Sequence, residues 1–241
     1  MMGLAEFDHH TFYLPALGPA SVVFDLGAAG GAFGANLHAM TGCRSICAEA
    51  SPSVFRNLQA ARGVEAHQLA VGGTDGPVSM TVGGHVGDTY WVRGVDDDGE
   101  DAGTETIEVP GVTLATLMAR TGVDFVDLIK LDIEGAEFAF FDAAGDDTLR
   151  RVGQMTVEFH DFLDPARRPD VLAIIRRLEG LGFATVIMTR NTLGDVLFLN
   201  RAHLPVDAVQ LFVMRTVVKY GRGIRRILAR RFAPRRSDMA A

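Results

Sequence analysis

Residues 129–137 read IKLDIEGAE, and residues 22–31, about a hundred positions earlier, read VVFDLGAAGG. Each stretch starts as an apolar β-strand and ends in acidic residues and glycine. In an open α/β sheet, ligands bind beyond the carboxyl ends of the strands. The two stretches therefore predict two strand ends that face one another across a single site. The earlier stretch suits a nucleoside-type cofactor, and the later one places carboxylates beside it.

The elements around these two strands alternate in type. Strand patterns occur at residues 22–26, 45–49, 66–71, 77–82, 125–131 and 154–159, and helical patterns at residues 31–40, 51–61, 112–120, 136–144 and 169–181. Residues 184–189 and 195–199 follow as a hairpin. Alternating strands and helices predict an α/β fold with a mostly parallel, doubly wound sheet. The closing hairpin adds an antiparallel strand to that sheet.

Composition is that of an ordinary globular protein. The chain has 241 residues, of which 48% are hydrophobic and 22% charged. No segment reaches the roughly 18 uninterrupted apolar residues of a membrane-spanning helix, and residues 1–11 lack the pattern of a secretory signal. Cys43 and Cys47 have neither the number nor the spacing of a disulfide framework, a redox pair or a zinc pair. We therefore expect two buried thiols in a cytoplasmic protein.

Charge is unevenly distributed along the chain. The net charge is −7, yet nine basic residues and no acidic residue lie between positions 208 and 237. Apolar residues alternate with the basic ones at helical spacing, which predicts a basic amphipathic helix. Such a helix either lies on an anionic membrane surface or docks on a partner, and packing against the acidic body of its own chain explains the pattern equally. We expect a folded domain over residues 1–205 and a basic tail over residues 206–241.

The distribution of charge bears on two kinds of partner, nucleic acid and membrane. An acidic body argues against a nucleic-acid-binding core. In the membrane interpretation, residues 208–236 hold the protein at the inner face of an anionic membrane.

The glycine-rich turn over residues 25–31 suits a cofactor without pyrophosphate. Four glycines between residues 27 and 34 let the backbone approach a ligand closely, but Ala29 interrupts the G-x-G of a dinucleotide fingerprint. S-adenosylmethionine fits, because backbone amides can bind its carboxylate and Asp25 its ammonium group. Glu49 ends the next strand and is expected to accept hydrogen bonds from the ribose hydroxyls, as an acid does in dinucleotide folds.

Further runs accompany the two stretches: AEASP at 48–52, LAVG at 69–72, VTL at 112–114 and TVEFH at 156–160. With DLIKLDIEGAE at 127–137, they make the chain resemble the FkbM family of S-adenosylmethionine-dependent methyltransferases over about residues 20–200. The K-x-D-x-E-G-x-E run is specific, whereas many methyltransferases share the glycine loop. The family usually has Asn at position 29, Pro-Asn at 50–51 and Asp at 115, where this chain has alanine, alanine-serine and alanine.

The resemblance implies a Rossmann-like class I methyltransferase fold over residues 1–205 and S-adenosylmethionine as cofactor. It also implies O-methylation of a hydroxyl on a sugar, a glycan or a small natural product. The implied cofactor contacts are Asp25, Gly27, Ala28, Ala29, Gly31, Glu49, Ala50 and Ala70. Two other functions stay open: a nicotinamide oxidoreductase, which the missing G-x-G disfavours, and a non-catalytic cofactor-binding scaffold held at membranes by the basic tail.

The candidate catalytic residues are Asp132, Glu134 and His160. Methyl transfer is an in-line displacement, so the protein mainly aligns the reactants, but an alcohol acceptor must also lose its proton to a carboxylate or an imidazole. Asp132 and Glu134 share one side of the chain if the strand persists, and His160 ends the neighbouring strand. We expect Asp132 to be the base. Glu158 is as consistent with orienting a neighbour as with acting. The three candidates could ligate magnesium, but proton abstraction explains them as well, so no metal is expected.

Overall fold

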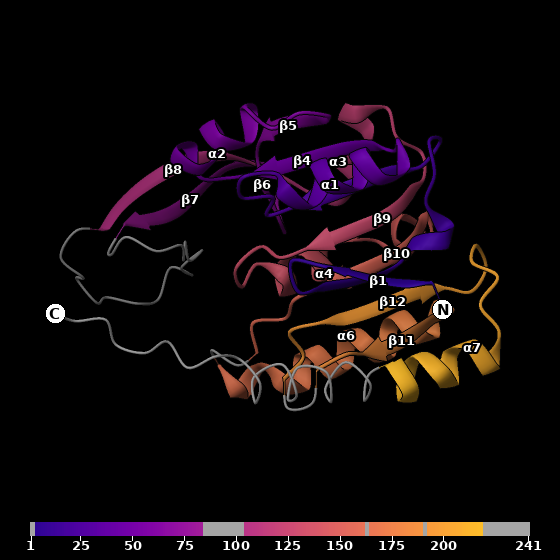
Figure 1. The fold of residues 1–241 in the computed structure, drawn as a ribbon. Helices are drawn as coiled ribbons and strands as arrows, with labels where there is room; N and C mark the ends of the chain where they lie inside the picture. Colours follow the sequence, from indigo (N-terminus) through magenta and orange to yellow (C-terminus); the bar gives the residue numbers. More distant parts are fainter. Residues whose placement is uncertain (1–2, 84–103, 162–163, 190–191, 219–241) are drawn as a thin grey trace, which may run out of the picture.

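One large sheet organises the fold. A computed structural model of the chain describes residues 3–83, 104–161, 164–189 and 192–218 (Figure 1). Seven strands form a sheet in the order β11-β12-β10-β9-β3-β4-β5. They are β3 (Val22–Leu26), β4 (Arg44–Glu49), β5 (Val64–Gln68), β9 (Val126–Leu131), β10 (Val152–Val157), β11 (Phe183–Ile187) and β12 (Val196–Asn200).

The sheet is parallel except at β12, which runs antiparallel to both of its neighbours. Strand β3 lies at its centre, between β4 and β9. The chain reverses its winding direction there, and open α/β sheets bind their ligands at such a point. The doubly wound, Rossmann-like sheet predicted from the sequence is confirmed, and so is the antiparallel hairpin strand.

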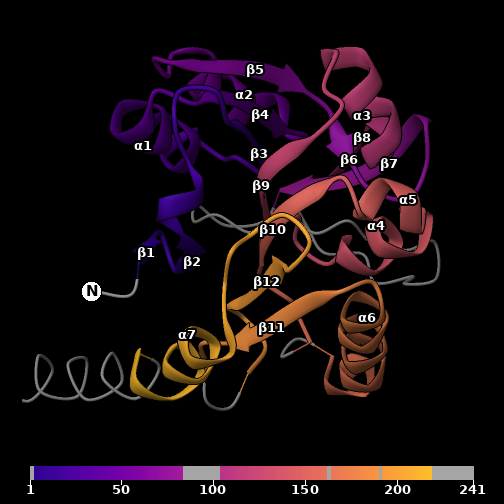
Figure 2. The same cartoon turned by 90° about the vertical axis from the view of Figure 1, so that its right-hand side faces the viewer.

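Helices cover both faces of this sheet (Figure 2). One face carries α3 (Leu114–Thr121), α4 (Glu137–Ala143), α5 (Asp146–Leu149) and α6 (Arg168–Gly180). The other carries α1 (Ala32–Thr41), α2 (Pro52–Gln59), α7 (Ala208–Val213) and a π-helical turn (Met214–Val218). Short 3-10 turns occupy Leu14–Ala16 and Pro165–Arg167.

Strand β3 is apolar on both faces because helices pack on both, as in other parallel sheets. Phe24 and Leu26 belong to the main core under α3, α4 and α6. Val23 points the other way and packs with Phe33 and Leu37 of α1. This alternation also directs Asp25 toward α1, with consequences for the site.

Three strands lie apart from the large sheet. The single strand expected at residues 66–71 is divided between β5 and a two-residue strand, β6 (Ala70–Val71). Strand β6 pairs with β8 (Thr104–Val112), which also pairs with β7 (Gly76–Gly83). Strand β8 was not predicted. The helix expected from residue 112 begins instead at Leu114, where the Thr113 side chain accepts a hydrogen bond from the Thr116 N–H.

An N-terminal hairpin was also missed. Strands β1 (Leu4–Phe7) and β2 (His10–Tyr13) pair antiparallel, with Phe7 opposite His10. The two turn residues, Asp8 and His9, both have positive φ angles, of 49° and 64°. Two-residue hairpin turns require such angles and usually use Asn-Gly or Asp-Gly. Without that glycine, the turn gave no signal in the sequence.

The described start of the basic tail packs on the sheet. Val206, Leu211 and Met214 are buried in a cluster with residues of β11 and β12. The Arg215 Nε donates a hydrogen bond to the Thr185 carbonyl at 2.9 Å. As far as residue 218, the chain therefore follows the interpretation in which the tail docks on its own body. Residues 219–241 lie outside the described part. Within that part, no helix is long and apolar enough to cross a bilayer.

Candidate functional site

The ends of β3 and β9 are joined by a backbone hydrogen bond and by a hydrogen bond from a lysine side chain. The Asp132 N–H donates to the Leu26 carbonyl at 3.1 Å, and the Lys130 Nζ donates to the Gly27 carbonyl at 2.6 Å. Gly27 has a φ of +74°, and a Cβ there would lie 1.6 Å from the Asp132 carbonyl oxygen. Only glycine meets both conditions. The expectation that these two strand ends face one another is confirmed.

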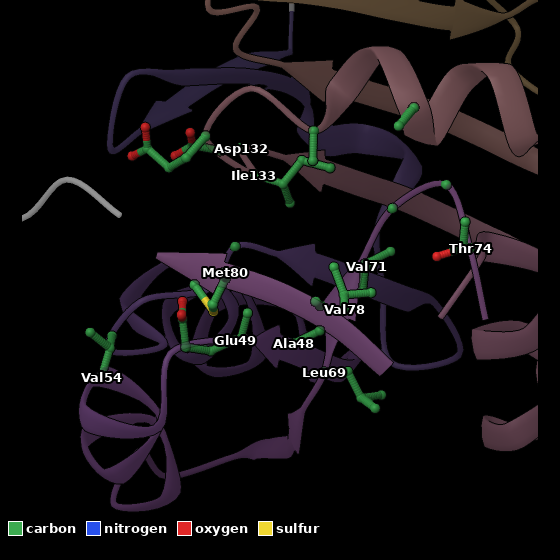
Figure 3. Close-up of a pocket in the computed structure, with 18 of the residues that line it drawn as sticks. Ala48, Glu49, Val54, Leu69, Val71, Thr74, Val78, Met80, Asp132 and Ile133 are labelled. Atoms are coloured by element: carbon green, nitrogen blue, oxygen red, sulfur yellow. The ribbon is translucent and has the colours of Figure 1, made fainter. Parts of the chain in front are cut away.

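A pocket of about 360 Å³ opens beside this junction (Figure 3). That volume is within the range of small-molecule sites. One wall comes from the ends of β3, β4 and β9, and the other from β6, β7 and the segments that flank them. The wall from the smaller sheet is apolar, with Val71, Val78 and Met80 facing the cavity. Of the residues predicted from the sequence, those that line it are Gly27, Ala29, Glu49, Ala50, Ala70, Asp132 and Glu134.

Glu49 ties the glycine loop to the end of β4. Its Oε2 accepts a hydrogen bond from the Ala29 N–H at 3.0 Å, and its Oε1 accepts one from the Ser51 N–H at 2.8 Å. Burial raises the pKa of Glu49, and these two N–H groups partly offset that rise. The carboxylate therefore reaches the pocket already oriented by backbone donors.

Asp25 does not line the pocket. It is fully buried under α1, where its Oδ2 accepts a hydrogen bond from the Gly34 N–H at 3.0 Å. Its Oδ1 lies 3.5 Å from the Lys130 Nζ. The expected contact with a cofactor ammonium group is therefore replaced by a supporting role beneath the loop, because strand alternation turns this side chain toward α1.

Ala28 and Gly31 also lie away from the pocket. Ala28 is buried in a small cluster with Cys47 and Leu58. Gly31 directly precedes α1, and a Cβ there would meet the Leu58 side chain at 2.6 Å. These two positions hold α2 against the loop. Both cysteines are buried, as expected.

The three predicted catalytic residues do come together. The His160 Nε2 lies 3.2 Å from the Glu134 Oε2 and 3.8 Å from the Asp132 Oδ1. The strand itself ends at Leu131, so strand alternation does not align the two carboxylates. A turn does so instead, in which Glu134 has a φ of +52°.

His160 is held as a cation. Its Nδ1 lies 3.1 Å from the Oε1 of the buried Glu137. Burial alone would lower the pKa of His160, but the hydrogen bonds and charges of Glu134 and Glu137 raise it to about 10. An imidazolium cannot accept a proton, so His160 orients and neutralises the neighbouring carboxylates.

Asp132 is a weaker base than the sequence suggested. Burial opposes its ionisation, but His10, Lys130 and His160 together hold the pKa of this carboxyl well below its usual range. The Lys130 Nζ lies 3.3 Å from the Asp132 Oδ2. A carboxylate with so low a pKa takes up a proton poorly. This low pKa disfavours the role of general base expected for Asp132, which stays a prediction.

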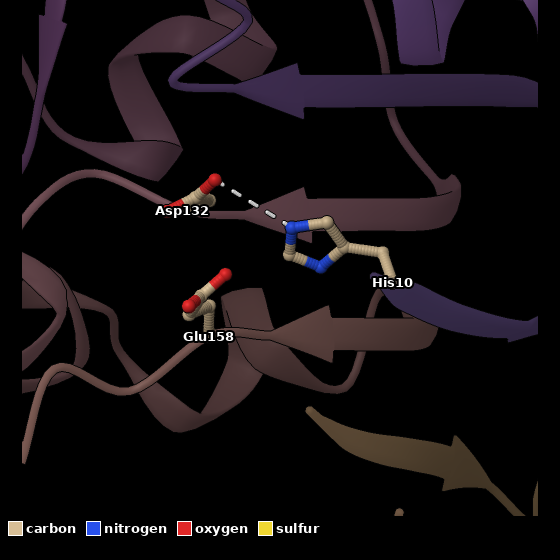
Figure 4. Close-up of side chains that lie close together, drawn as sticks. All are labelled: His10, Asp132 and Glu158. Carbon is tan, nitrogen blue, oxygen red and sulfur yellow. Dashed lines mark ion pairs between the residues drawn. The ribbon is translucent and has the colours of Figure 1, made fainter. Parts of the chain in front are cut away.

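His10 is the residue of the site that sequence reasoning missed. It comes from β2, is only 1% exposed, and its Nε2 lies 3.6 Å from the Asp132 Oδ2 (Figure 4). Its Nδ1 lies 3.3 Å from the Thr156 Oγ1, and its ring packs edge-on against Phe33. The ring is thus fixed from two sides and directed at the end of β9.

Polar contacts fix the hairpin that carries His10. The Gln154 side chain accepts a hydrogen bond from the Tyr13 N–H at 2.7 Å and donates one to the Tyr13 carbonyl at 3.1 Å. Asp195 accepts hydrogen bonds from the backbone N–H and from the hydroxyl of Thr11. These contacts hold the two residues Thr11 and Tyr13, which follow His10 in β2, against Gln154 of β10 and against Asp195, which directly precedes β12. The position of His10 is therefore set by the main sheet.

Glu158 completes the cluster. It directly follows β10, and its carboxylate makes no hydrogen bond or ion pair with any residue that the structure describes. Burial and then the charge of Asp132 raise its pKa. Glu158 is therefore the more basic of the two carboxylates beside His10.

Comparison with known proteins agrees with this geometry. Residues 25–184 match the family described as the methyltransferase FkbM domain. The match covers well over half of the chain and includes both strand ends at the pocket. No curated protein matches significantly. The Rossmann-like class I methyltransferase fold implied by the sequence is confirmed.

Solved methyltransferase structures are similar only distantly. A precorrin-6y C5,15-methyltransferase from Geobacter metallireducens GS-15 is 15% identical to this chain. The match covers 76% of this chain and 80% of the methyltransferase, with a TM-score of 0.36. The N-terminal domain of EvdMO1, solved with SAH bound, is 14% identical over 77% of this chain and 74% of its own, with a TM-score of 0.38. The fold assignment rests on the strand order rather than on these low scores.

Proposed function

This chain belongs to the FkbM family and is an S-adenosylmethionine-dependent methyltransferase, and we propose that it methylates a hydroxyl group of a sugar, a glycan or another small natural product. The observation that carries the proposal is the group of carboxylates at the ends of β9 and β10. Asp132 and Glu134 line the pocket, and Glu158 lies beside Asp132. An alcohol must lose a proton as it is methylated, and such a group can accept it.

The pocket has the features that the cofactor requires. Glu49 keeps a free lone pair on each carboxylate oxygen, because each oxygen accepts one backbone hydrogen bond. We assign it to the ribose hydroxyls. The apolar wall with Val78 and Met80 suits the adenine ring, and Gly27 and Ala29 offer backbone to the methionine end. When bound, the cofactor supplies an electrophilic methyl group on its sulfonium.

We assign proton acceptance to Glu158 rather than to Asp132. Burial raises the pKa of Glu158, whereas the neighbouring cations keep Asp132 ionised. The permanent charge of Asp132 suits it to orient the acceptor hydroxyl. His160 holds Glu134 in place through a contact of 3.2 Å. Alignment of this kind is worth several kcal/mol in displacement reactions.

A methyl-transfer assay with paired acceptors tests the hydroxyl assignment. The purified chain is incubated with S-adenosylmethionine and a panel of sugars, polyols and phenols, each beside its deoxy analogue. We expect S-adenosylhomocysteine release with some hydroxyl compounds, no release with their deoxy partners, and an ether-type methyl signal in the product NMR spectrum. A product methylated on nitrogen or carbon would overturn the assignment.

A cofactor titration distinguishes the proposed function from the oxidoreductase and from the non-catalytic scaffold. Calorimetry should detect binding of S-adenosylmethionine and none of NADH. If NADH bound and S-adenosylmethionine did not, the oxidoreductase function would be favoured. If the cofactor bound but no acceptor of any class turned over, the non-catalytic scaffold would be favoured.

A further inference from the structure

Among the residues that the structure describes, one nitrogen of the His10 imidazole has no hydrogen-bond partner. His10 is almost completely buried, and the nitrogen concerned is its Nε2. The nearest acceptor, the Asp132 Oδ2, is 3.6 Å away, which is beyond hydrogen-bonding distance. A buried polar nitrogen left unpaired costs roughly 1–3 kcal/mol. The position therefore suggests a ligand that this nitrogen would contact.

Two carboxylates converge on the same point. Asp132 and Glu158 each offer an oxygen, and these atoms lie with a His10 ring nitrogen within 4.8 Å of one another. Figure 4 shows the three side chains directed at one another from the ends of β9, β10 and strand β2. Two atoms that each lie about 2.1 Å from a shared metal ion are roughly 3 to 4 Å apart. The 3.6 Å gap between His10 and Asp132 has that size.

We propose that His10, Asp132 and Glu158 bind a divalent metal ion. One imidazole and two carboxylates form a mixed nitrogen and oxygen donor set, which suits a first-row ion such as Mn²⁺. Three protein ligands leave coordination positions open, as in catalytic rather than structural sites. The metal-free expectation drawn from the sequence did not include His10.

The surrounding charge favours a dication. Among the described residues, the cations that face the site are Lys130, 3.3 Å from Asp132, and His160. The carboxylates around them outnumber these cations and are those of Asp25, Asp132, Glu134, Glu137 and Glu158. The region therefore has room for further positive charge.

A neighbouring set of side chains is a weaker candidate. Asp132, Glu134 and His160 are also close enough to hold a metal. However, both nitrogens of His160 already face carboxylates, at 3.1 Å from Glu137 and 3.2 Å from Glu134. A metal would have to displace one of these contacts, whereas the His10 Nε2 makes no hydrogen bond with the described residues that a metal would displace.

The role of the ion rests on the proposed function, although its binding does not. Asp132 borders the cofactor pocket, so an acceptor hydroxyl could complete the coordination there. A bound metal ion lowers the pKa of a coordinated hydroxyl and orients it.

A manganese titration tests the site without cofactor or acceptor. Chelator-treated protein is titrated with Mn²⁺, and the free ion is followed by its electron paramagnetic resonance signal. We expect one ion per chain, and at least about tenfold weaker binding in His10→Phe and in Glu158→Gln. Phenylalanine keeps the ring shape against Phe33. Glu158→Gln is the second variant because the wild-type carboxylate has no described hydrogen bond to lose.

Matched controls come from the same chain. His9→Asn changes the neighbouring exposed histidine and keeps a residue that tolerates its positive φ angle. Glu179→Gln removes an exposed carboxylate on α6. Both should bind Mn²⁺ as the wild type does, and circular dichroism should show that all four variants fold.

Two results would overturn the proposal. One is a wild-type chain that binds neither Mn²⁺ nor Zn²⁺ at millimolar concentration. The other is wild-type affinity in both His10→Phe and Glu158→Gln. Calorimetry with S-adenosylmethionine on the same samples keeps the questions apart: metal binding without cofactor binding would reject the proposed function alone, and the reverse would reject only the metal site.

Discussion

Gly27 and Asp132 meet so closely that a Cβ on the first would lie 1.6 Å from the carbonyl oxygen of the second. The contact joins the cofactor loop after β3 to the carboxylates after β9. Lys130 reinforces it by donating to the Gly27 carbonyl. The two halves of the site are therefore positioned by backbone geometry, and a change at this contact should disturb cofactor binding and stability together.

Gly27→Ala should lower the free energy of unfolding by several kcal/mol, because the methyl group adds a backbone clash to an unfavourable φ. Gly122→Ala is the matched control. It has a φ of +64° and no atom within 4 Å of a built Cβ, so it should cost only about 1–2 kcal/mol. Urea unfolding followed by circular dichroism measures both. Equal losses would show that the Gly27 contact is looser than described.

Ala29→Gly should stabilise the chain by up to about 1 kcal/mol. Ala29 has a φ of +47°, a left-handed conformation that costs a residue with a Cβ roughly that amount. Asn tolerates this region better than alanine, so Ala29→Asn should also be stabilising. Urea unfolding followed by circular dichroism also measures these two changes in stability. Destabilisation by both substitutions would mean that the Ala29 methyl group makes packing contacts worth more than the strain.

Glu49→Gln should weaken S-adenosylmethionine binding by about 1–3 kcal/mol. The amide can accept only one of the two backbone hydrogen bonds that Ala29 and Ser51 now donate, and it loses one acceptor for the ribose. Titration calorimetry measures the change, with the exposed Glu108→Gln as control. Unchanged affinity would remove Glu49 from the cofactor site.

The same residue should make cofactor affinity depend on pH. Burial raises the pKa of Glu49 above its ordinary 4.5 in the free protein, and a protonated carboxyl accepts fewer hydrogen bonds. Affinity should therefore fall as pH is lowered from neutral to about pH 5. In Glu49→Gln this fall should be absent. An identical pH profile in the variant would assign the effect to another group.

Truncation after Val218 should leave the domain folded, because Leu211, Met214 and the Arg215 contact are retained. It removes eight of the nine basic residues of the tail. We propose that these residues hold the protein at an anionic membrane surface, where each is worth roughly 1 kcal/mol and is screened by salt. Full-length protein should sediment with anionic vesicles at low salt, and the truncated chain should not. No sedimentation of the full-length chain would end the membrane interpretation.

Much of the fold was predictable because its signals are local. The central strands β3 and β9 are apolar runs that end in glycine and acid, and the closing hairpin alternates in the expected way. Strand β8 was missed because it pairs with β6 and β7 in a separate sheet, outside the alternation of strands and helices that predicts the large sheet. The division of residues 66–71 between two sheets depends on contacts distant in sequence, which no local pattern encodes.

The site was predicted in part for a similar reason. Glu49, Asp132 and Glu134 follow strand ends, and parallel topology brings such ends together. Asp25 was expected at the cofactor, but the position of its side chain depends on the face of β3 to which it points, and that face lies under α1. His10 had no signal at all, since its hairpin turn uses Asp8 and His9 in place of glycine. Basicity, too, depends on neighbours: the placement of His10, Lys130 and His160 lowers the pKa of Asp132.

The hairpin that carries His10 lies before residue 25, where the family match begins. The glycine loop, Glu49 and the strand ends that border the pocket thus lie within the matched segment, while the imidazole beside Asp132 comes from a short hairpin that precedes it. An expression clone that began at residue 25 would keep the glycine loop and Glu49, yet it would lose the imidazole that lies beside Asp132.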